Sequence, residues 1–481
     1  GNPRKFARVA RRVAQHKPIV AIKAGRSAAG RRAGQSHTAA AAASDDVVDA
    51  LFQQAGVVRV TAMEQMLDAA RVLSEQPLPS GPRVAIIGNS GGPGILSADA
   101  AEGAGLDVVT LTADTEAAVR AAVPSAASCQ NPIDLGAAVR PDQLANALTA
   151  VLAAPEVDAV LTVYTDTAVT PTDEVMDRIG AVAGGQHKPV VATRVGAPAG
   201  SITSGTRTLP VFTFPEPAAA ALAVAVRYAD IRRARPLAVE RPTGVDLAAA
   251  RRLVTTALRA GTEWLPHESV RELLAGYGVP VSPQRVARGC EAAVAAAAEL
   301  GYPVAVKLAA PGIHKSDRGG VRLDIADEAQ LRTVAAELGG AVEEQLLLQP
   351  MAAAGTEVIV GAVQHEQFGP VVMLGAGGVL ADLLGDRTFR LAPIASDEAE
   401  AMIGELKLAK LLDGYRGRPV VSRAALADVV ARVAMLVDDL PEVAELDLNP
   451  LICTADGLCA VDARIRLAPA TPRPDPLMRR L

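Results

Sequence analysis

The stretch that decides the fold is RVAIIGNSGGPG, residues 83–94. Residues 84–87 form a short apolar run, typical of a strand buried in a parallel sheet, and a helix is expected from Ile95 through Ala104. Glycines after a strand let backbone amides face an anion, and the dipole at a helix N-terminus favours phosphate. The turn has neither the GxGxxG spacing of dinucleotide-binding proteins nor a Walker lysine. We therefore predict a phosphate cradle here, with a tight strand-to-helix turn that binds no ligand as the alternative.

Similar units recur along the chain, which indicates an α/β fold. Residues 18–22, PIVAI, form another short apolar run, and such runs alternate with longer stretches of helical period. At 481 residues the chain is too long for one hydrophobic core. Proline-rich breaks at 76–82, at 235–243 and after residue 468 divide it into three blocks and a tail.

An internal echo links the first two blocks. QHKPIVA at 15–21 recurs as QHKPVVA at 186–192, and each copy is predicted to be a helix end followed by a strand. A glycine-rich loop, another short strand and an alanine-rich helix follow each copy. The first copy carries a longer polar insert, residues 25–46, and an extra polar loop on a shared scaffold is where chemistry is expected. Chance similarity between two units rich in Ala and Val is the alternative.

Composition excludes several classes of protein. Lys plus Arg number 48 against 53 Asp plus Glu, for a net charge of −5; without a long basic block and with few aromatics, no nucleic-acid surface is indicated. The four scattered cysteines indicate neither a disulfide framework nor a zinc site, and they favour a reducing cytoplasm. No apolar run reaches the roughly 18 residues that a membrane span needs. Residues 1–4 lack an initiator Met and secretory-signal features, so we expect a piece of a longer protein.

The polar insert contains the first candidate catalytic side chain, His37. It lies in GQSHT, residues 34–38, among small and hydroxyl-bearing residues that leave an imidazole open to a phosphate group. Arg26, Arg31 and Arg32 precede it and would neutralise phosphate charge. For this segment alone, an inert surface histidine is the alternative.

The third block contains segments suited to a nucleotide. GYPVAVK at 301–307 is predicted to be a strand ending in Lys307, a side chain that suits nucleotide phosphates. The next loop, GIHKSDRGGV at 312–321, is polar and closed by glycine, as expected of a loop that folds over a phosphate chain. Residues 346–351 and 355–361 are predicted to be the following two strands.

A set of oxygen ligands is predicted near the end of this block. Strand alternation in ELDLNPL, residues 445–451, puts Glu445, Asp447 and Asn449 on one face. Asp462 on a neighbouring strand would complete a set suited to Mg²⁺. Alternating charge on a solvated strand is the alternative.

Together these segments resemble the ADP-forming acyl-CoA synthetases, relatives of succinyl-CoA synthetase, over nearly the whole chain. The resemblance implies an α/β fold of two flavodoxin-like units, the first incomplete, followed by an ATP-grasp domain. The implied boundaries are 1–78 and 79–236 for the flavodoxin-like units, 237–262 for a linker, 263–467 for the ATP-grasp domain and 468–481 for a proline-rich tail. The motifs that carry it are SHT at 36–38, NSGGPG at 89–94, NPIDL at 131–135, HKSD at 314–317, GGV at 319–321, FGPVV at 368–372 and DLNP at 447–450.

The resemblance also implies a phosphate relay. His37 would be phosphorylated between the N-termini of two helices, and His314 would be a second histidine that carries phosphate between distant sites. The implied ligands are ATP or ADP, Mg²⁺ and CoA, and the reaction converts an acid, CoA and ATP into acyl-CoA, ADP and phosphate, or the reverse. The expected nucleotide and phosphate contacts are Lys307, Glu357, Ser90, Gly91, Gly92, Gly319 and Gly320, and the expected metal ligands are Asn449, Asp462 and Asp447.

The sequence departs from the family pattern in ways that leave alternatives open. A CoA-binding domain and the first half of the first flavodoxin-like unit are expected before residue 1, so we expect a partner segment, a second chain or an oligomer, and an incomplete reaction without it. Ala39 stands where the family usually has Gly, and Asp382 where Glu is usual. One rival is a non-catalytic acyl-CoA or nucleotide sensor fused to a lysine acetyltransferase. A second rival, another ATP-grasp ligase for amino acids or peptides, leaves the first two blocks unexplained.

Overall fold

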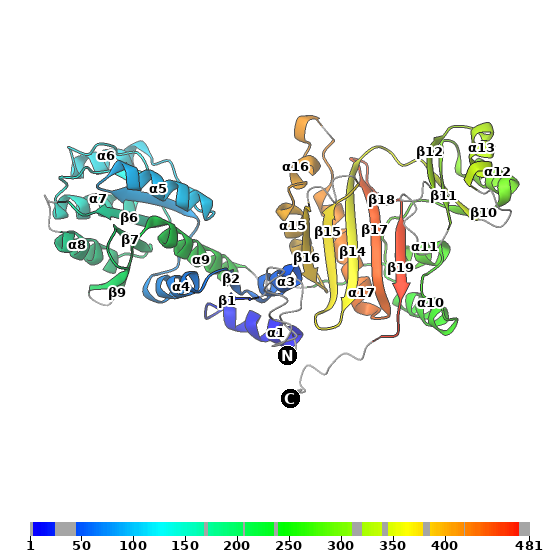
Figure 1. The fold of residues 1–481 in the computed structure, drawn as a ribbon, viewed down its shortest axis with the longest axis horizontal. Helices are drawn as coiled ribbons and strands as arrows, with labels where there is room; N and C mark the ends of the chain where they lie inside the picture. The colour runs from blue at the N-terminus through cyan, green and yellow to red at the C-terminus, as the bar shows by residue number, and fades with distance from the viewer. Residues whose placement is uncertain are drawn as a thin grey trace. The chain divides into compact units, whose positions relative to one another are not determined.

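The structure is a computed structural model that describes residues 3–24, 45–167, 172–204, 207–234, 239–309, 320–338, 345–378, 385–417 and 419–470. The chain forms two compact units (Figure 1). The N-terminal unit consists of residues 6–43 and 52–235, and the C-terminal unit consists mainly of residues 236–481. In the part of the chain that the structure describes, no helix has the length and apolar character needed to span a membrane.

The N-terminal unit is built on a seven-stranded sheet. Its order is β4-β3-β6-β7-β9-β8, and β5 also pairs with β3. Neighbouring strands are parallel except β8 and β9. Taken in chain order, the parallel strands β3, β4, β6, β7 and β9 have the 2-1-3-4-5 arrangement of flavodoxin-like folds. Their bounds are β3 (Arg83–Gly88), β4 (Asp107–Val108), β5 (Ile133–Asp134), β6 (Ala159–Thr165), β7 (Val190–Val195), β8 (Gly200–Ser204) and β9 (Arg207–Phe212).

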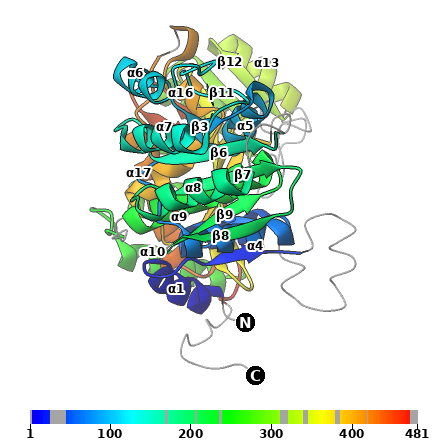
Figure 2. The ribbon, with the colours of Figure 1, turned by 90° about the vertical axis from the view of Figure 1, so that its left-hand side faces the viewer.

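Helices cover both faces of this sheet, because its strands are apolar on both sides. Buried residues of α6, α7 and α8 form the core on one face, and those of α4, α5 and α9 form the core on the other (Figure 2). The bounds are α4 (Met63–Glu75), α5 (Gly91–Gly103), α6 (Ala113–Ala122), α7 (Pro141–Ala153), α8 (Thr172–Gly184) and α9 (Pro215–Arg233).

A second, two-stranded sheet packs on the outer side of α4 and α9. Its strands β1 (Val20–Ile22) and β2 (Val58–Val60) are parallel, and Val58 and Val60 share a core with Val224 and Tyr228 of α9. The helices α1 (Pro3–Ala14) and α3 (Asp45–Ala55) precede the two strands. The internal echo is confirmed in the described residues, since β1, β2 and α4 repeat the order and parallel pairing of β7, β9 and α9.

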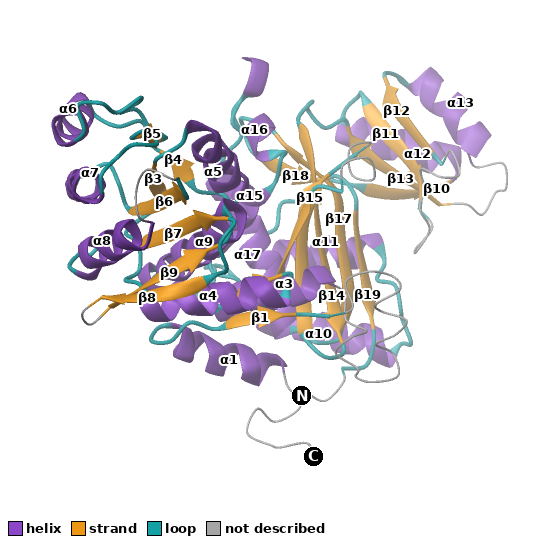
Figure 3. Cartoon of the chain, turned by 60° about the vertical axis from the view of Figure 1, so that its left-hand side comes forward, coloured by secondary structure: helices purple, strands orange, loops and turns teal. Residues whose placement is uncertain are grey.

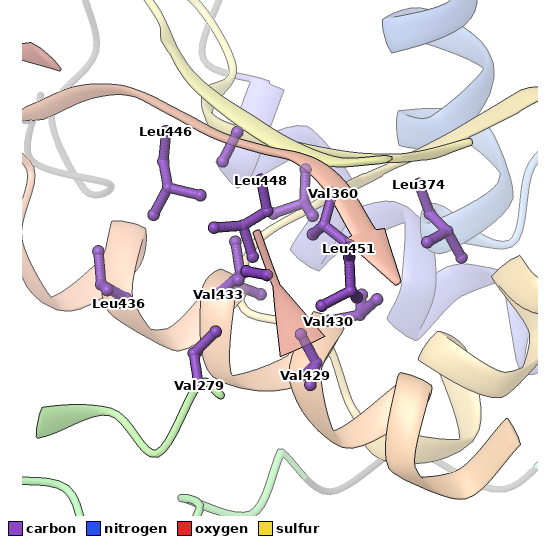
Figure 4. Close-up of a cluster of buried hydrophobic side chains, with 14 of the residues drawn as sticks. Val279, Val360, Leu374, Val429, Val430, Val433, Leu436, Leu446, Leu448 and Leu451 are labelled. Carbon is purple, nitrogen blue, oxygen red and sulfur yellow. The ribbon is translucent and has the colours of Figure 1, made fainter. Parts of the chain in front are cut away.

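The C-terminal unit contains a large antiparallel sheet with one covered face. Its order is β16-β15-β14-β17-β18, and β19 pairs with β17 beside β18. Helices α10, α11, α15, α16 and α17 pack against one face, where Val360, Leu436 and Leu448 are fully buried (Figure 4). The strands are β14 (Thr356–His365), β15 (Gly369–Ala376), β16 (Arg387–Leu391), β17 (Val443–Cys453), β18 (Leu458–Ala460) and β19 (Ala463–Leu467). The helices are α10 (Leu247–Arg259), α11 (His267–Gly276), α15 (Ser396–Glu405), α16 (Ala409–Leu412) with the 3₁₀ turn η3 (Tyr415–Gly417), and α17 (Arg423–Asp439).

A smaller four-stranded sheet completes this unit (Figure 3). Its order is β10-β13-β11-β12, and α12 and α13 bury Ala293, Ala297 and Leu331 against it. The C-terminal unit thus contains two antiparallel sheets, each with its own helical layer. The bounds are β10 (Arg285–Arg288), β11 (Val304–Leu308), β12 (Val321–Ile325), β13 (Gln345–Pro350), α12 (Gly289–Leu300) and α13 (Glu328–Leu338).

Packing crosses two of the positions at which the sequence suggested boundaries. The stretch 237–262, expected to be a linker, contains α10, whose Ala250 and Val254 are buried in the core of the C-terminal unit. Helix α4, expected to close the first block, buries Val72 in the core beneath α9. Apolar faces on α4 and α10 explain both contacts, and the domain boundaries themselves stay predictions.

Candidate active site

The first part of the site lies at the carboxyl ends of β3 and β6. These neighbouring strands flank the point where the strand order reverses, which is where open α/β sheets bind ligands. Asn89, directly after β3, is 1% exposed and joins the two strand ends. Its amide nitrogen donates to the carbonyl oxygen of Thr165 over 2.8 Å, and its amide oxygen accepts from the backbone N–H of Thr165 over 2.9 Å. The side chain therefore holds the turn after β3 against the end of β6.

The segment predicted to be a phosphate cradle forms the turn into α5 and the N-terminus of that helix. Ser90 is the residue before the helix, and its side chain makes no capping hydrogen bond to the helix backbone. Gly91 and Gly92 are the first two helical residues, and both are exposed. A Cβ at Gly91 would lie 3.2 Å from a carboxylate oxygen of Asp134, whereas a Cβ at Gly92 would meet nothing within 4 Å. The first turn of this 13-residue helix is thus unobstructed at Gly92, whereas Gly91 lies beside the Asp134 carboxylate.

The motif at 131–135 has a structural explanation. Strand β3 pairs on one side with β4 at Arg83 and Val84 and with β5 at Ile87 and Gly88, which leaves a gap between the two partners. Asn131 fills this gap: its oxygen accepts from the N–H of Ile86 over 2.8 Å, and its nitrogen donates to the carbonyls of Val84 and Val109. This asparagine completes the sheet beneath the cradle.

The second part of the site lies in the C-terminal unit, where Lys307 reaches from the small sheet to the large one. Lys307 is on β11 and is 7% exposed, and its ammonium donates to the carbonyl oxygen of Val461 over 2.8 Å. Val461 precedes Asp462 in the bend between β18 and β19. The predicted phosphate-binding lysine and a predicted metal ligand are therefore brought together, although 154 residues separate Lys307 from Val461 in the sequence.

The predicted oxygen ligands lie on the face of β17 that the helices do not cover. Leu446 and Leu448 are buried in the core, so alternation turns Glu445, Asp447 and Asn449 to the opposite face. The backbone N–H of Asn449 donates to the carbonyl oxygen of Asp462 over 3.1 Å, which places these two residues side by side. Strand alternation correctly predicted the shared face of Glu445, Asp447 and Asn449. Asp462, expected on a neighbouring strand, lies in the bend just before β19.

Asp447 is paired with an arginine, unlike Asn449 and Asp462, which lie beside each other. One of its carboxylate oxygens lies 3.2 Å from a guanidinium nitrogen of Arg464 on β19. Burial raises the pKa of Asp447, Arg464 lowers it, and the charges of Asp462 and Glu445 raise it further. Burial is the largest of these effects, so the pKa of Asp447 is raised overall.

The few oxygen donors at this position suit Mg²⁺, which keeps several water ligands, better than an ion whose ligands all come from protein side chains. Among the described residues, no three His, Cys, Asp or Glu side chains form a group that would hold a metal ion. Mg²⁺ is usually held by one or two carboxylates, substrate phosphates and water, and an amide oxygen also suits it. Asn449 and Asp462 match that sparse, oxygen-only set.

Glu357 lies on β14, the strand that pairs with β17, and Gly320 lies beside the end of β11, the strand of Lys307. Glu357 is exposed near the start of β14, and a Cβ added to Gly378 would overlap its carboxylate. Gly378 has a φ of +62°, so glycine is favoured there by both conformation and space. Gly320 is buried, and its carbonyl oxygen accepts from the N–H of Leu308 at the end of β11.

Several predicted residues lie outside the described part of the chain. These are the two candidate phosphate carriers, His37 and His314, and also Gly319. The arginines before His37 and the two departures from the family pattern are outside it as well: Arg26, Arg31, Arg32, Ala39 and Asp382.

Sequence reasoning missed three polar side chains that shape the site. Asn89 and Asn131 were quoted only within motifs, and their roles depend on strand neighbours that no local pattern reveals. Arg464 was missed as the partner of Asp447. Its signal was available, because Glu445 and Asp447 alternate on one predicted strand as Arg464 and Arg466 do on the other, a pattern typical of cross-strand ion pairs.

Comparison with protein-family models assigns three consecutive segments. Residues 1–73 match the succinyl-CoA ligase like flavodoxin domain, residues 84–247 the ligase-CoA domain, and residues 256–467 the ATP-grasp domain. The fold is accordingly two flavodoxin-like units followed by an ATP-grasp domain, as the resemblance implied.

Curated relatives match over nearly the whole chain. The 4-hydroxybutyrate-CoA ligase (ADP-forming) of Nitrosopumilus maritimus is 32% identical over 97% of this chain and 69% of its own length. The acetate-CoA ligase (ADP-forming) I of Archaeoglobus fulgidus is 34% identical over 96% of this chain and 68% of its own. The beta subunit of acetate-CoA ligase (ADP-forming) I of Pyrococcus furiosus is 39% identical over 46% of this chain and its whole length. The chain belongs to the ADP-forming acyl-CoA ligases, a family of enzymes.

Proposed function

We propose that this chain uses ATP to phosphorylate its own histidine and passes that phosphate to a carboxylic acid, the ATP-dependent part of an ADP-forming acid-CoA ligase. The observation that carries the proposal is the contact between Lys307 and the Val461 carbonyl, since it joins the predicted phosphate-binding lysine to the Asn449 and Asp462 pair. Family membership supplies the reaction class, and this geometry supports a place for the triphosphate in the C-terminal unit.

In the C-terminal unit, Lys307 would bind the phosphates of ATP, and Asn449 and Asp462 would hold Mg²⁺. The metal would neutralise charge on the phosphate that is transferred. Glu357, exposed at the start of β14, would lie near the nucleotide. The carbonyl oxygen of Gly320 accepts a hydrogen bond from the N–H of Leu308. His314 would be the second carrier, and Gly319 would contact phosphate.

In the N-terminal unit, the open end of α5 would bind the phosphate that His37 carries. The N-terminal amides of α5, at half-buried Ser90 and at exposed Gly91 and Gly92, would favour a doubly charged phosphate through hydrogen bonds and the helix dipole. A carboxylate of the acid would then attack phosphorus, forming acyl phosphate and releasing the histidine. Attack of the CoA thiol on the acyl carbon would give the thioester and inorganic phosphate.

The CoA step is proposed to need more than the residues described here. The chain spans about two thirds of the length of the two ligases that match it end to end, and the Pyrococcus relative is by name a subunit. A further segment, a partner chain or another subunit of an oligomer would supply the CoA site. The four free cysteines support a reducing, cytoplasmic setting.

Labelling with γ-labelled ATP and Mg²⁺ tests the proposal. Wild type should take up acid-labile, base-stable label, and His37→Ala should remove it. His314→Ala should slow labelling or prevent it if His314 passes phosphate to His37. His187→Ala is the matched control, because it is an exposed histidine of the same unit in the echo segment, and it should label like wild type.

Absence of label from wild type, with nucleotide still bound, would overturn the relay and favour a nucleotide sensor. The relatives named above are ligases rather than acetyltransferases, and this favours the catalytic interpretation. Label that persists in His37→Ala and is lost in His314→Ala would assign the stable phosphohistidine to the other carrier.

A further inference from the structure

Three pairs of residues follow one another along the open face of the large sheet, between β17 and β19. The register pairs Glu445 with Arg466 and Asp447 with Arg464, and the next pair is Asn449 with Asp462. The first two pairs are ion pairs, with N–O distances of 3.3 Å and 3.2 Å. This ladder of three cross-strand pairs therefore ends at the proposed metal ligands, Asn449 and Asp462. Arg464 is the cation of the pair next to them.

The two ion pairs differ in their environment. In the outer pair, the side chains of Glu445 and Arg466 are 42% and 33% exposed. In the inner pair, those of Asp447 and Arg464 are 24% and 18% exposed. Arg466 also lies 4.0 Å from Glu263, so two carboxylates surround it. The inner pair is thus the more sheltered, and its electrostatic effects are screened less by solvent.

We propose that Arg464 binds the nucleotide's phosphate chain beside the metal, and that Asp447 is a positioning residue for Arg464 rather than a ligand of Mg²⁺. This inference rests on the proposed function, because it takes the nucleotide to bind at Asn449 and Asp462. A phosphate held there would have Lys307 on the side of the Val461–Asp462 bend and Arg464 on the side of the strand pair. Two cations would then flank a group that carries several negative charges.

The chemistry of arginine supports this role. A guanidinium has five N–H donors in a planar fork, so an arginine oriented by a carboxylate can bind phosphate at the same time. The carboxylate that orients it need not touch the metal. Asp447 already faces Arg464, and Mg²⁺ needs few protein ligands when phosphates and water complete its shell.

Calorimetric titration of the full chain with ADP and with AMP, first in EDTA and then with Mg²⁺, tests the assignment. Arg464→Met should weaken binding of metal-free ADP roughly tenfold to a hundredfold, the range expected for a lost hydrogen bond between charged groups. AMP, which has one phosphate, should lose much less. Asp447→Asn should weaken metal-free ADP severalfold, because Arg464 is then less firmly oriented. Arg464→Lys keeps the charge and should fall between wild type and Arg464→Met.

Arg466→Met is the matched control, since it breaks the neighbouring ion pair of the same ladder, and it should bind ADP like wild type. Asp447→Asn that alters only the Mg²⁺-dependent part of binding would make Asp447 a metal ligand and overturn the inference. Normal binding of metal-free ADP by a folded Arg464→Met would overturn it as well. Failure of wild type itself to bind ADP in either condition would refute the proposed function, and the inference with it.

Discussion

Replacing Asn89 with alanine should destabilise the N-terminal unit while leaving the C-terminal unit unchanged. Asn89 is 1% exposed and makes two hydrogen bonds of normal length to the backbone of Thr165. Alanine removes both bonds and leaves the N–H and carbonyl of Thr165 without those partners at the end of β6. The turn that leads into α5 then loses its attachment to the neighbouring strand.

The size of the effect follows from these two bonds. A hydrogen bond contributes about 1 kcal/mol net, and a partner left buried without one costs about 1–3 kcal/mol. Two such bonds at a partly sheltered strand end give a loss of about 2–4 kcal/mol. With a urea m-value of about 2 kcal/mol/M, the midpoint should fall by about 1–2 M.

The chain contains one tryptophan, which makes the two units separable in one experiment. Trp264 belongs to the C-terminal unit, where it bridges to Arg466 on β19. Its fluorescence should report unfolding of that unit, whereas far-UV circular dichroism reports both. Asn89→Ala should therefore shift part of the dichroism transition to lower urea and leave the fluorescence transition in place.

Asn146→Ala provides the control for this substitution. Asn146 is an exposed asparagine of the same unit on α7, where alanine has the higher helix propensity, so stability should stay equal or rise slightly. An unshifted dichroism transition in Asn89→Ala would refute the reasoning, because it would mean that the Asn89 bonds do not hold the strand ends together. An equal shift of the fluorescence transition would show that the units do not unfold separately.

Three further outcomes follow from the structure. Leu436→Ala, on the fully buried face of α17, should cost about 2–5 kcal/mol and, in contrast to Asn89→Ala, shift the Trp264 fluorescence transition. Hydrogen bonding by Arg83 lowers the pKa of the buried Asp158 to about 2. A carboxyl whose pKa is lower in the folded than in the unfolded chain stabilises the fold at pH values above its unfolded pKa. Roughly 2 kcal/mol of the free energy of unfolding should therefore be lost as the pH falls from about 4 toward 2. Asp158→Asn should remove that part of an acid-denaturation profile. Gly378→Ala should displace the Glu357 carboxylate and raise the KM for ATP, whereas Gly103→Ala at the end of α5, where a Cβ meets nothing within 4 Å, should leave it unchanged.

Most of the fold was predictable because the strands correspond to short apolar runs in the sequence. The run at 84–87 became β3, the echo at 186–192 became the start of β7, and GYPVAVK ended in β11 with Lys307 near its end. Helix α10 was harder, because proline-rich flanks mark a linker whether or not the residues between them pack. The decisive feature was its apolar face, on which Ala250 and Val254 are buried.

The candidate site was predictable wherever one strand determined it. Alternation alone placed Asp447 and Asn449 on the same face of β17, because every second residue of a strand faces one side. The partner of Asp447 depended on the register of β19. A one-residue slip of that strand would turn Arg464 to the other face of the sheet. Contacts of Asn131 and Lys307 join segments far apart in the sequence, so they emerge only from the folded chain.

The positions of the described histidines sharpen the labelling experiment. His16 and His187 each precede a parallel strand, β1 or β7, and so lie at the amino edge of their sheets, whereas α5 begins at the carboxyl edge. His267 begins α11 on the covered side of the large sheet, and His365 ends β14, at the opposite end from Glu357. Each of these four, of the six histidines in the chain, thus lies away from the predicted phosphate-binding position of its own unit. Stable histidine label should therefore disappear completely when His37 and His314 are both replaced, and any label that survived would show that phosphate reaches a position this geometry does not provide.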